Sequence, residues 1–322
     1  MGNSSGKPYM IGIIGGGVAG MACALWLKQL GCTPIILEQN TKPGGQLLQL
    51  NRINRWVLGS PGQTSVQLAE TYAEHIRQVA VDIIFQARLL AAATTATGFA
   101  VEVEQAGTRL YFSMRALVIA TGTRVLGPEI FADLPGFSSC YQAGGISFFP
   151  TAHVGQLPEL AGKSVAVIGG GDNAYFTAKD AALAGAQVHL LIRSRPKARP
   201  VVHREVLGLV AQGRIIEHVG AQASAFRQHQ GGIEILLQDN GKVYADRVFA
   251  RLGFAANTEF LDSFAVFNGM AKEAGYIKTD ASKRTSIPWV YAIGDVANAK
   301  HQSVVNAIAE GAIAAQDLSE RV

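Results

Sequence analysis

The order of apolar and polar positions along the chain predicts two copies of one supersecondary unit. Near the start, an apolar run at residues 9–14 leads through a cluster of glycines into an alanine-rich stretch at 21–30. In the middle, residues 163–168 lead through a second glycine cluster into another alanine-rich stretch. A short apolar run bounded by glycine is typical of a buried parallel strand. We therefore expect two strand–turn–helix units.

Further apolar runs extend each unit into a sheet. Residues 34–37 and 187–192 are short apolar segments, each placed after one of the two expected helices. Alternating apolar and polar residues at 98–112 and 223–248 predict two small antiparallel meanders. Because strands alternate with helices, we predict an α/β fold of two three-layer Rossmann-like dinucleotide-binding domains, each carrying a small antiparallel β meander.

Both glycine clusters have the spacing of a turn that binds pyrophosphate. The first is Gly15-Gly16-Gly17-Val18-Ala19-Gly20, and the second is Gly169-Gly170-Gly171-Asp172-Asn173-Ala174. The first glycine of such a motif permits a tight turn, the second lets the backbone approach phosphate, and the last allows close helix packing. The helix that follows directs its free N–H groups at the phosphates. One such motif is weak evidence, but two in the same context indicate two dinucleotide sites.

Charged residues distinguish the two sites. Glu38 ends the strand after the first turn, whereas Arg193 and Arg195 follow the strand after the second. A carboxylate at this position accepts hydrogen bonds from a ribose diol and repels a 2′-phosphate, whereas guanidinium groups bind one. The second site therefore favours NADPH over NADH. The alternatives are a solvent-exposed glutamate at a strand end and a basic surface loop.

Three further segments resemble the flavoprotein disulfide reductase superfamily, and most closely its low-molecular-weight thioredoxin reductase branch. They are residues 42–46, which include Gly45 and Gln46, residues 116–122 and residues 285–295. The resemblance covers essentially the whole chain and implies that the first site binds FAD. It implies that Gly45 and Gln46 lie along the flavin, that Asp295 binds the ribityl chain, and that residues 301–303 approach the ring.

The redox-active Cys-x-x-Cys of thioredoxin reductases is missing. Phe149 and Ala152 stand at the corresponding positions, and the three cysteines, Cys23, Cys32 and Cys140, form no such motif. In this respect the chain is similar to the thioredoxin reductase-like ferredoxin/flavodoxin–NADP⁺ reductases, whose flavin exchanges electrons directly with a one-electron carrier. Phe148 and Phe149 either shield the flavin or pack in a core.

The resemblance implies an FAD-dependent oxidoreductase that moves electrons between NADPH and an external acceptor, such as an acidic ferredoxin or flavodoxin. Three alternatives stay open. One is an atypical disulfide reductase or thiol oxidase that uses Cys140 or a bound disulfide. Another is a second FAD in the second site, since Tyr175 and Phe176 directly follow that turn and a glycine turn recognises pyrophosphate rather than a base. The last is a flavin-bound sensor with negligible turnover.

Composition sets the remaining expectations. The 322 residues are 48% hydrophobic and 16% charged, as expected for two globular domains. The formal charge of +4 is not concentrated in a Lys/Arg run, so nucleic acid is not an expected partner. No signal peptide is evident, no metal ligands are spaced as a site, and glycines interrupt the one apolar stretch that could imitate a membrane helix. We expect a cytoplasmic protein without a membrane segment, and the resemblance suggests a homodimer.

The expected domains are a discontinuous FAD-binding domain, residues 1–122 and 254–322, and an inserted NAD(P)H-binding domain, residues 123–253. The residues predicted to bind FAD are Gly15, Gly17, Ala19, Gly20, Glu38, Gly45, Gln46, Ala120, Thr121, Gly122, Gly294, Asp295, Gln302 and Ser303. Those predicted to bind NADPH are Gly169, Gly171, Asp172, Asn173, Ala174, Arg193 and Arg195, and Phe148, Phe149 and His301 are candidates for positions near the flavin.

Overall fold

The computed structural model describes residues 10–50 and 52–322, which form two compact units. The first unit comprises the described residues up to Arg124 together with Ala255–Val322, and the second comprises Val125–Phe254. The chain passes between the units along two short strands, β8 (Thr123–Val125) and β17 (Phe254–Ala256), which pair with each other. Each unit is described separately below.

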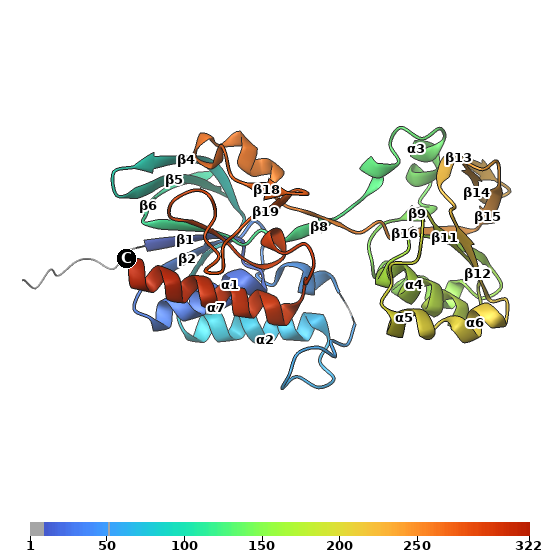
Figure 1. Ribbon diagram of the computed structural model, residues 1–322, viewed down its shortest axis with the longest axis horizontal. Coiled ribbons are helices and arrows are strands. Elements are labelled where there is room, and N and C mark those ends of the chain that lie inside the picture. Colours follow the sequence, from blue (N-terminus) through green and yellow to red (C-terminus); the bar gives the residue numbers. More distant parts are fainter. Residues whose placement is uncertain (1–9, 51) are drawn as a thin grey trace, which may run out of the picture. The chain divides into compact units, whose positions relative to one another are not determined.

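A parallel sheet of five strands forms the centre of the first unit, in the order β20-β7-β1-β2-β3 (Figure 1). Its strands are β1 (Met10–Ile14), β2 (Thr33–Leu37), β3 (Asp82–Ile84), β7 (Ala116–Ile119) and β20 (Val290–Ala292). Every pairing is parallel, so the carboxyl ends of all five strands lie at one edge. That edge carries the first glycine turn directly after β1.

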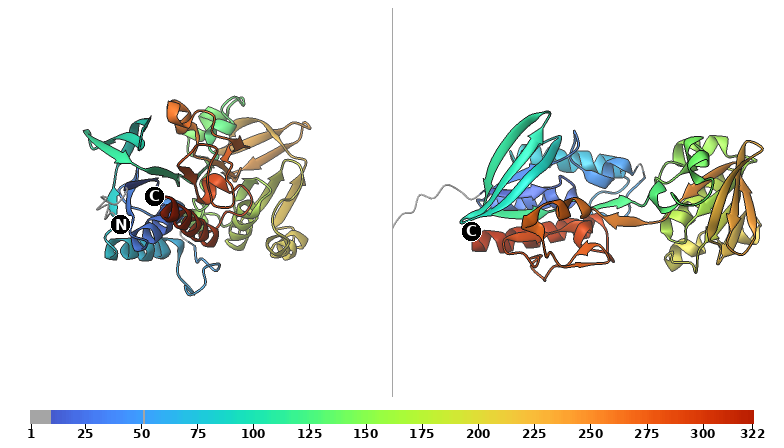
Figure 2. Two further views of the ribbon diagram at one scale, coloured as in Figure 1. Left: turned by 60° about the vertical axis from the view of Figure 1, so that its left-hand side comes forward. Right: turned by 90° about the horizontal axis from the view of Figure 1, so that it is seen from above.

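Two layers cover this sheet (Figures 1 and 2). On one face pack the helices α1 (Val18–Gln29), α2 (Ser65–Gln78) and α7 (Val304–Arg321). On the other lies the antiparallel sheet β4 (Ala87–Thr95), β5 (Gly98–Gln105) and β6 (Thr108–Met114). Ile11 and Ile13 belong to the core under the helices, whereas Ile14 belongs to the core under the meander. The sheet is buried on both faces, which explains why its strands read as continuous apolar runs.

Short elements complete the first unit. They are the 3₁₀ helices η1 (Gly45–Gln49), η4 (Glu259–Ser263), η5 (Ala265–Phe267) and η6 (Gly294–Ala297), with the hairpin strands β18 (Lys272–Glu273) and β19 (Tyr276–Ile277).

The second unit repeats the three-layer plan. Its central sheet has the order β12-β11-β10-β16-β9, built from β9 (Ile146–Ser147), β10 (Ser164–Ile168), β11 (Gln187–Ile192), β12 (Ile215–Val219) and β16 (Arg247–Ala250). Helices α4 (Asp172–Leu183), α5 (Pro200–Arg204) and α6 (Leu207–Ala211) cover one face. The meander β13 (Ala223–His229), β14 (Gly232–Leu237) and β15 (Lys242–Ala245) covers the other with α3 (Phe137–Gln142). The 3₁₀ helices η2 (Pro128–Ile130) and η3 (Val154–Glu159) lie in its connections.

The predicted fold class is confirmed, and three expected elements need correction. Residues 223–248 do not form one meander, because Arg247–Ala250 is the parallel strand β16 beside β10. The apolar residues of β16 are buried on both faces of the sheet. The alternating pattern of the preceding residues led us to extend the meander into this strand. The small sheet of the first unit gains a strand that we did not expect, β4. Helix α1 begins at Val18 rather than at residue 21, so it starts directly at the glycine turn.

Candidate functional site

The first glycine turn, residues 15–20, is shaped by backbone contacts that exclude side chains. Gly15 has φ +110°, and a Cβ on it would lie 2.5 Å from the Ala120 carbonyl oxygen. A Cβ on Gly20 would lie 2.0 Å from the Gly15 carbonyl oxygen. A Cβ on Gly17, by contrast, would meet no atom within 4 Å. The turn therefore leaves open space in front of the α1 N-terminus, where a phosphate can approach.

Glu38 lies beside this turn, and the alternative of an exposed strand-end glutamate is wrong. Its side chain is 4% exposed. Oε2 accepts a hydrogen bond from the Gly16 N–H at 2.7 Å, and Oε1 accepts from the Asn40 backbone at 2.8 Å and from its Nδ2 at 2.7 Å. A carboxylate offers about four lone-pair positions, so acceptor capacity remains for a ribose hydroxyl.

The predicted segment at residues 42–46 is tied to the first turn. The Gly44 N–H donates to the Gly16 carbonyl at 2.8 Å, which brings the start of η1 against the turn. Gln46 donates through Nε2 to the Thr123 carbonyl at 2.8 Å and to Thr123 Oγ1 at 2.5 Å. The structure thus brings Gly45 and Gln46 together with the turn and with the segment that follows β7.

The end of β7 completes this side of the site. The Ala120 N–H donates to the Ile14 carbonyl at 2.8 Å, directly before the first turn. Thr121 and Asn257 bond reciprocally, from Thr121 Oγ1 to the Asn257 carbonyl and from Asn257 Nδ2 to the Thr121 carbonyl, both at 2.8 Å. The Asn257 N–H also donates to the Gly122 carbonyl. Sequence reasoning did not identify Asn257, whose role depends on a contact between segments 136 residues apart.

Asp295 is held beside the first turn by a buried glutamate. A Cβ on Gly294 would lie 2.8 Å from Ala19 Cβ, so η6 packs against the start of α1. Glu310 Oε2 accepts from the Gly294 N–H at 2.7 Å, and its Oε1 accepts from Lys283 Nζ at 3.1 Å and from Asn298 Nδ2 at 3.2 Å. Glu310 was not predicted as a site residue.

The Asp295 carboxyl group itself is available to a ligand. Within residues 10–50 and 52–322, no hydrogen bond or ion pair engages its side chain. Burial, with a smaller contribution from the negative charge of Glu310, raises the pKa of Asp295 to about 6. A half-buried carboxyl group without a partner is costly unless a ligand supplies one. It therefore suits the polyhydroxyl chain of FAD.

The segment before α7 presents the remaining candidates. Gln302 Nε2 donates to the Tyr276 hydroxyl at 3.3 Å, and His301 is exposed. Ser303 is the N-cap of α7, and its side chain accepts the Asn306 N–H at 3.1 Å. Its hydroxyl oxygen thus stabilises the helix end. The residues of the first unit fit FAD: an open turn, a carboxylate for the ribose and an unengaged carboxyl group for the ribityl chain.

The second glycine turn, residues 169–174, has the same backbone design. Gly169 has φ +147°, and a Cβ on it would lie 2.3 Å from the Arg251 carbonyl oxygen. Gly171, like Gly17, has no atom within 4 Å of the space a Cβ would occupy. Ala174 is fully buried where the first turn has Gly20. The Lys197 N–H, in the loop after β11, donates a hydrogen bond to the Gly170 carbonyl at 2.7 Å and so contacts the turn.

One acidic residue at the second turn is paired with an arginine, and two further arginines nearby are exposed. Asp172, the first residue of α4, accepts the Arg199 backbone N–H at 2.8 Å and Arg199 Nε at 2.5 Å. This pairing neutralises a carboxylate that would otherwise oppose a phosphate at the helix N-terminus. Arg193 and Arg195 are exposed on the loop after β11. Asn173 contributes a carbonyl that accepts Thr177 Oγ1 at 2.8 Å.

The aromatic pair after the second turn belongs to the core of its unit. Tyr175 is fully buried, and its hydroxyl donates to Glu217 Oε1 at 2.7 Å. Burial, reinforced by Glu217, raises the pKa of Tyr175. Phe176 is half-buried and packs against the same core. Tyr175 therefore does not line the dinucleotide site, which removes one reason to expect a larger stacking ligand there.

Residues 147–153, which include the positions of the missing dithiol, are fixed at both ends by a buried network. Arg251 donates from Nη1 to the Ser147 carbonyl at 3.1 Å, and its Nη2 lies 3.4 Å from His153 Nδ1. His153, fully buried, places Nε2 3.0 Å from Asp180 Oδ2. Phe148 packs with Phe131 and other rings of the second unit's core, whereas Phe149 is half-buried. The core interpretation thus holds for Phe148.

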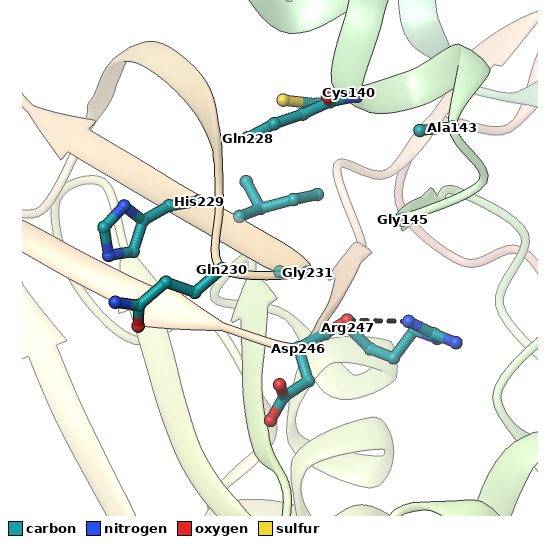
Figure 3. A pocket seen from close by; sticks show the side chains of 11 residues that line it. Cys140, Ala143, Gly145, Gln228, His229, Gln230, Gly231, Asp246 and Arg247 are labelled. Carbon is teal, nitrogen blue, oxygen red and sulfur yellow. Dashed lines mark hydrogen bonds between the residues drawn. The ribbon is translucent and has the colours of Figure 1, made fainter.

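Cys140 lies beside a pocket at the opposite edge of the second sheet (Figure 3). The pocket, of about 360 Å³, also contacts Gly145, His229 and the amino end of β16 at Arg247. Because β16 runs parallel to β10, this edge is remote from the Gly169 turn. The thiol is buried, and burial raises its pKa, so it stays protonated and poorly nucleophilic. This position does not suit a cysteine that exchanges electrons with a dinucleotide.

The described part of the chain offers neither a membrane span nor a metal centre. No helix there is both long enough and apolar enough to cross a membrane. No group of three or more His, Cys, Asp or Glu side chains within residues 10–50 and 52–322 is arranged to hold a metal ion.

Comparison with known proteins identifies the family. Residues 9–311 match the model of the pyridine nucleotide-disulphide oxidoreductase family. The chain belongs to this family, and its relatives place it in the thioredoxin reductase-like branch.

Two curated relatives and one solved structure illustrate the range of this similarity. The chain is 29% identical to a subunit of alkyl hydroperoxide reductase from Pseudomonas putida over 93% of its own length but only 55% of that protein. It is 26% identical to thioredoxin reductase of Coxiella burnetii, covering 95% of this chain and 93% of that protein. The bacillithiol disulfide reductase structure from Bacillus cereus has the same fold, with 21% identity, a TM-score of 0.80 and coverage of 98% and 100%. The chain thus spans little more than half of the first of these relatives.

Proposed function

We propose that this protein transfers electrons between NADPH and an acidic one-electron carrier protein of the ferredoxin or flavodoxin type, without a cysteine relay. The observation that carries the proposal is the composition of residues 147–153, where Phe149 and Ala152 stand in place of two cysteines. A disulfide relay needs a thiolate and a partner sulfur. Cys140 lies at the far edge of the second sheet, and Cys23 is a buried residue of helix α1.

The first unit is proposed to bind FAD and the second NADPH. When bound, FAD supplies the redox chemistry, because it accepts a hydride and releases electrons singly or in pairs. The protein's residues bind and orient it: the open turn at Gly17 admits the pyrophosphate, Glu38 accepts from the ribose, and Asp295 accepts from the ribityl chain. In the second unit Gly171 admits the pyrophosphate and the exposed Arg193 and Arg195 bind the 2′-phosphate.

Stopped-flow mixing of the holoenzyme with NADPH, followed by a carrier-dependent assay, tests this function. We expect NADPH to bleach the visible flavin absorbance, and cytochrome c reduction to require added ferredoxin or flavodoxin. Replacing Cys140 with Ser should leave both signals unchanged. Flavin that stays oxidised in NADPH would favour a sensor, and disulfide reduction that is lost in the Cys140→Ser variant would favour a thiol mechanism.

The nucleotide preference has its own test. Replacing Arg193 and Arg195 with Ala should raise the Kd for NADPH about ten- to a hundredfold and leave that for NADH unchanged, because only NADPH carries the phosphate they would bind. Mass spectrometry of the ligands released on denaturation distinguishes one bound FAD from two. A second FAD in the purified protein would contradict the NADPH assignment.

Assembly and location are proposed from the resemblance. We expect a cytoplasmic homodimer, and light scattering coupled to gel filtration would measure the mass of the assembly. A monomeric mass at micromolar concentration would contradict it.

A further inference from the structure

A loop of the first unit, residues 52–62, exposes an unusual amount of apolar surface. Ile53 is 55% exposed, Trp56 67% and Leu58 100%. Single exposed apolar residues are ordinary on protein surfaces and need no explanation. Three within six positions, one of them tryptophan, form a cluster of the kind that marks an interaction site. Figure 1 shows the loop projecting from the unit between η1 and α2.

The loop is anchored, so these side chains are presented on a fixed frame. Ile53 and Thr64 form an antiparallel bridge, and the Asn54 N–H donates to the Gln63 carbonyl at 2.9 Å. Thr64 then caps α2 in a reciprocal arrangement with Gln67. Between the exposed Trp56 and Leu58, Val57 turns inward against a small core that includes Leu47 and Leu68. A frame of this kind lowers the entropy cost of binding a partner.

The charged residues next to the loop in the sequence are all basic. No Asp or Glu occurs between Glu38 and Glu70, whereas Lys42, Arg52 and Arg55 lie in that interval. Lys42 and Arg55 are exposed. These charges favour a partner that brings negative charge to the same surface. Tryptophan and arginine are also the residue types that contribute most to binding at protein interfaces.

The loop follows directly on the segment proposed to lie along the flavin. Three residues separate the end of η1 at Gln49 from Ile53, and η1 begins with Gly45 and Gln46. We propose that residues 52–62 are the docking site for the acidic electron-carrier protein, with Trp56 and Leu58 as apolar anchors and Arg55 as a charged contact. This inference rests on the proposed function and adds to it the surface that the acceptor uses.

The test compares carrier-dependent with carrier-independent activity of the FAD-loaded full chain. The double variant Trp56→Ser/Leu58→Ser should raise the KM for ferredoxin or flavodoxin about tenfold or more, since the loss of interface anchors weakens binding strongly. Its NADPH–ferricyanide activity should stay unchanged, because ferricyanide needs no docking surface. Tyr111→Ser/Leu183→Ser is the matched control, since both residues are exposed on other surfaces. It should leave both activities unchanged.

Two charge reversals distinguish a contact made by Arg55 from an effect of the protein's net charge. Arg55→Glu and Lys28→Glu change the net charge equally, and both side chains are exposed. We expect Arg55→Glu to raise the carrier KM at low salt several-fold more than Lys28→Glu does, with the difference shrinking at high salt. An equal effect of the two reversals would overturn the role of Arg55.

The possible outcomes distinguish a failure of the docking site from a failure of the proposed electron-transfer function. A wild-type enzyme that reduces ferricyanide but neither carrier would overturn both. A wild-type enzyme that reduces a carrier, with an unchanged KM in the double variant, would overturn the docking site alone. Sedimentation with phosphatidylglycerol vesicles tests whether the loop binds a membrane instead of a carrier protein. If the double variant loses vesicle binding and keeps its carrier KM, the loop is a membrane contact and the proposal is wrong.

Discussion

The two glycine turns of this protein have nearly the same backbone and differ in the charged side chains beside them. In each, the first glycine lies against the carbonyl of a neighbouring strand end, at Ala120 in the first unit and at Arg251 in the second. In the first turn, the buried Glu38 side chain accepts the Gly16 N–H. Both turns also have one backbone support in common, because the Gly44 N–H donates to the Gly16 carbonyl and the Lys197 N–H donates to the Gly170 carbonyl. The difference between the turns is therefore the Glu38 carboxylate.

This difference would let the two turns serve the two ligands proposed above. Support by a carboxylate places negative charge where a ribose diol binds and a 2′-phosphate is repelled. Beside the second turn, the following loop instead carries the exposed Arg193 and Arg195, which suit the proposed 2′-phosphate. The single acidic residue at the second turn, Asp172, is paired with Arg199. The proposed charge selectivity thus follows from the side chains beside each turn, because the backbone support is shared.

The largest effect should come from the last position of each motif. Gly20→Ala would force a methyl group to within 2.0 Å of the Gly15 carbonyl oxygen. We expect it to destabilise the first unit by about 3 kcal/mol and to abolish FAD retention. The reverse change in the second turn, Ala174→Gly, should cost only about 1 kcal/mol through helix propensity. Denaturant unfolding and flavin content measure both; equal effects would mean that the two turns pack alike.

The open glycines should separate binding from stability. Gly17 and Gly171 have φ of −72° and −94° and no neighbour within 4 Å of an added Cβ. Ala is therefore tolerated at either position, and the free energy of unfolding should change by less than about 1 kcal/mol. Each methyl group would occupy the space proposed for a pyrophosphate. We expect Gly17→Ala to weaken FAD and Gly171→Ala to weaken NADPH about tenfold or more, measured by titration. Unchanged affinity in either variant would place that pyrophosphate elsewhere.

The turns and their charges were readable from the sequence because all of their determinants are local. Six consecutive residues specify each turn, and Glu38 and Arg193 follow at the ends of the next strands. The ambiguity of Tyr175 was also local, since an aromatic residue at a helix start fits a core or a ligand equally well. Its full burial and its contact with Glu217 on strand β12 show that it belongs to the core.

The residues that hold the site in place were missed because their partners are distant in sequence. Arg251 contacts Ser147 and His153 about a hundred residues upstream, and no local pattern marks a buried arginine. Glu310 did leave a signal. Its helix buries Ala307, Gly311, Ala314 and Leu318, and Glu310 falls on the same face. An acidic residue on an apolar helix face must have a buried partner, here the Gly294 N–H and Lys283.

A smaller effect should distinguish the charged side chains beside the two turns. Glu38→Gln keeps the shape of the side chain but cannot accept at both oxygens, so the hydrogen bonds from Gly16 and Asn40 cannot all be kept. We expect a loss of about 1–2 kcal/mol in the first unit. Arg199→Ala removes an exposed ion pair from the second turn and should cost about 0.5 kcal/mol. Hydrogen exchange resolved by peptide reports on each turn separately. A larger loss of protection at residues 169–174 in Arg199→Ala than at residues 15–20 in Glu38→Gln would reverse the comparison.

The last effect is the dependence on pH that Asp295 gives to the first unit. Asp295 is held beside the first turn with its pKa raised to about 6 by burial and by Glu310. In the unfolded chain it ionises near pH 4. The folded, FAD-free unit therefore binds the proton more tightly, and its stability falls as pH rises through 6. Between pH 5 and 7.5 we expect a loss of about 1 kcal/mol. Asp317, whose pKa Arg284 lowers to about 2, contributes its change below pH 4, outside this window. Burial lowers the pKa values of His189 and His218 in the second unit, so stability there changes in the same pH range. The difference in slope between the wild type and Asp295→Asn in thermal unfolding of the FAD-free protein therefore measures the Asp295 contribution; equal slopes would contradict it.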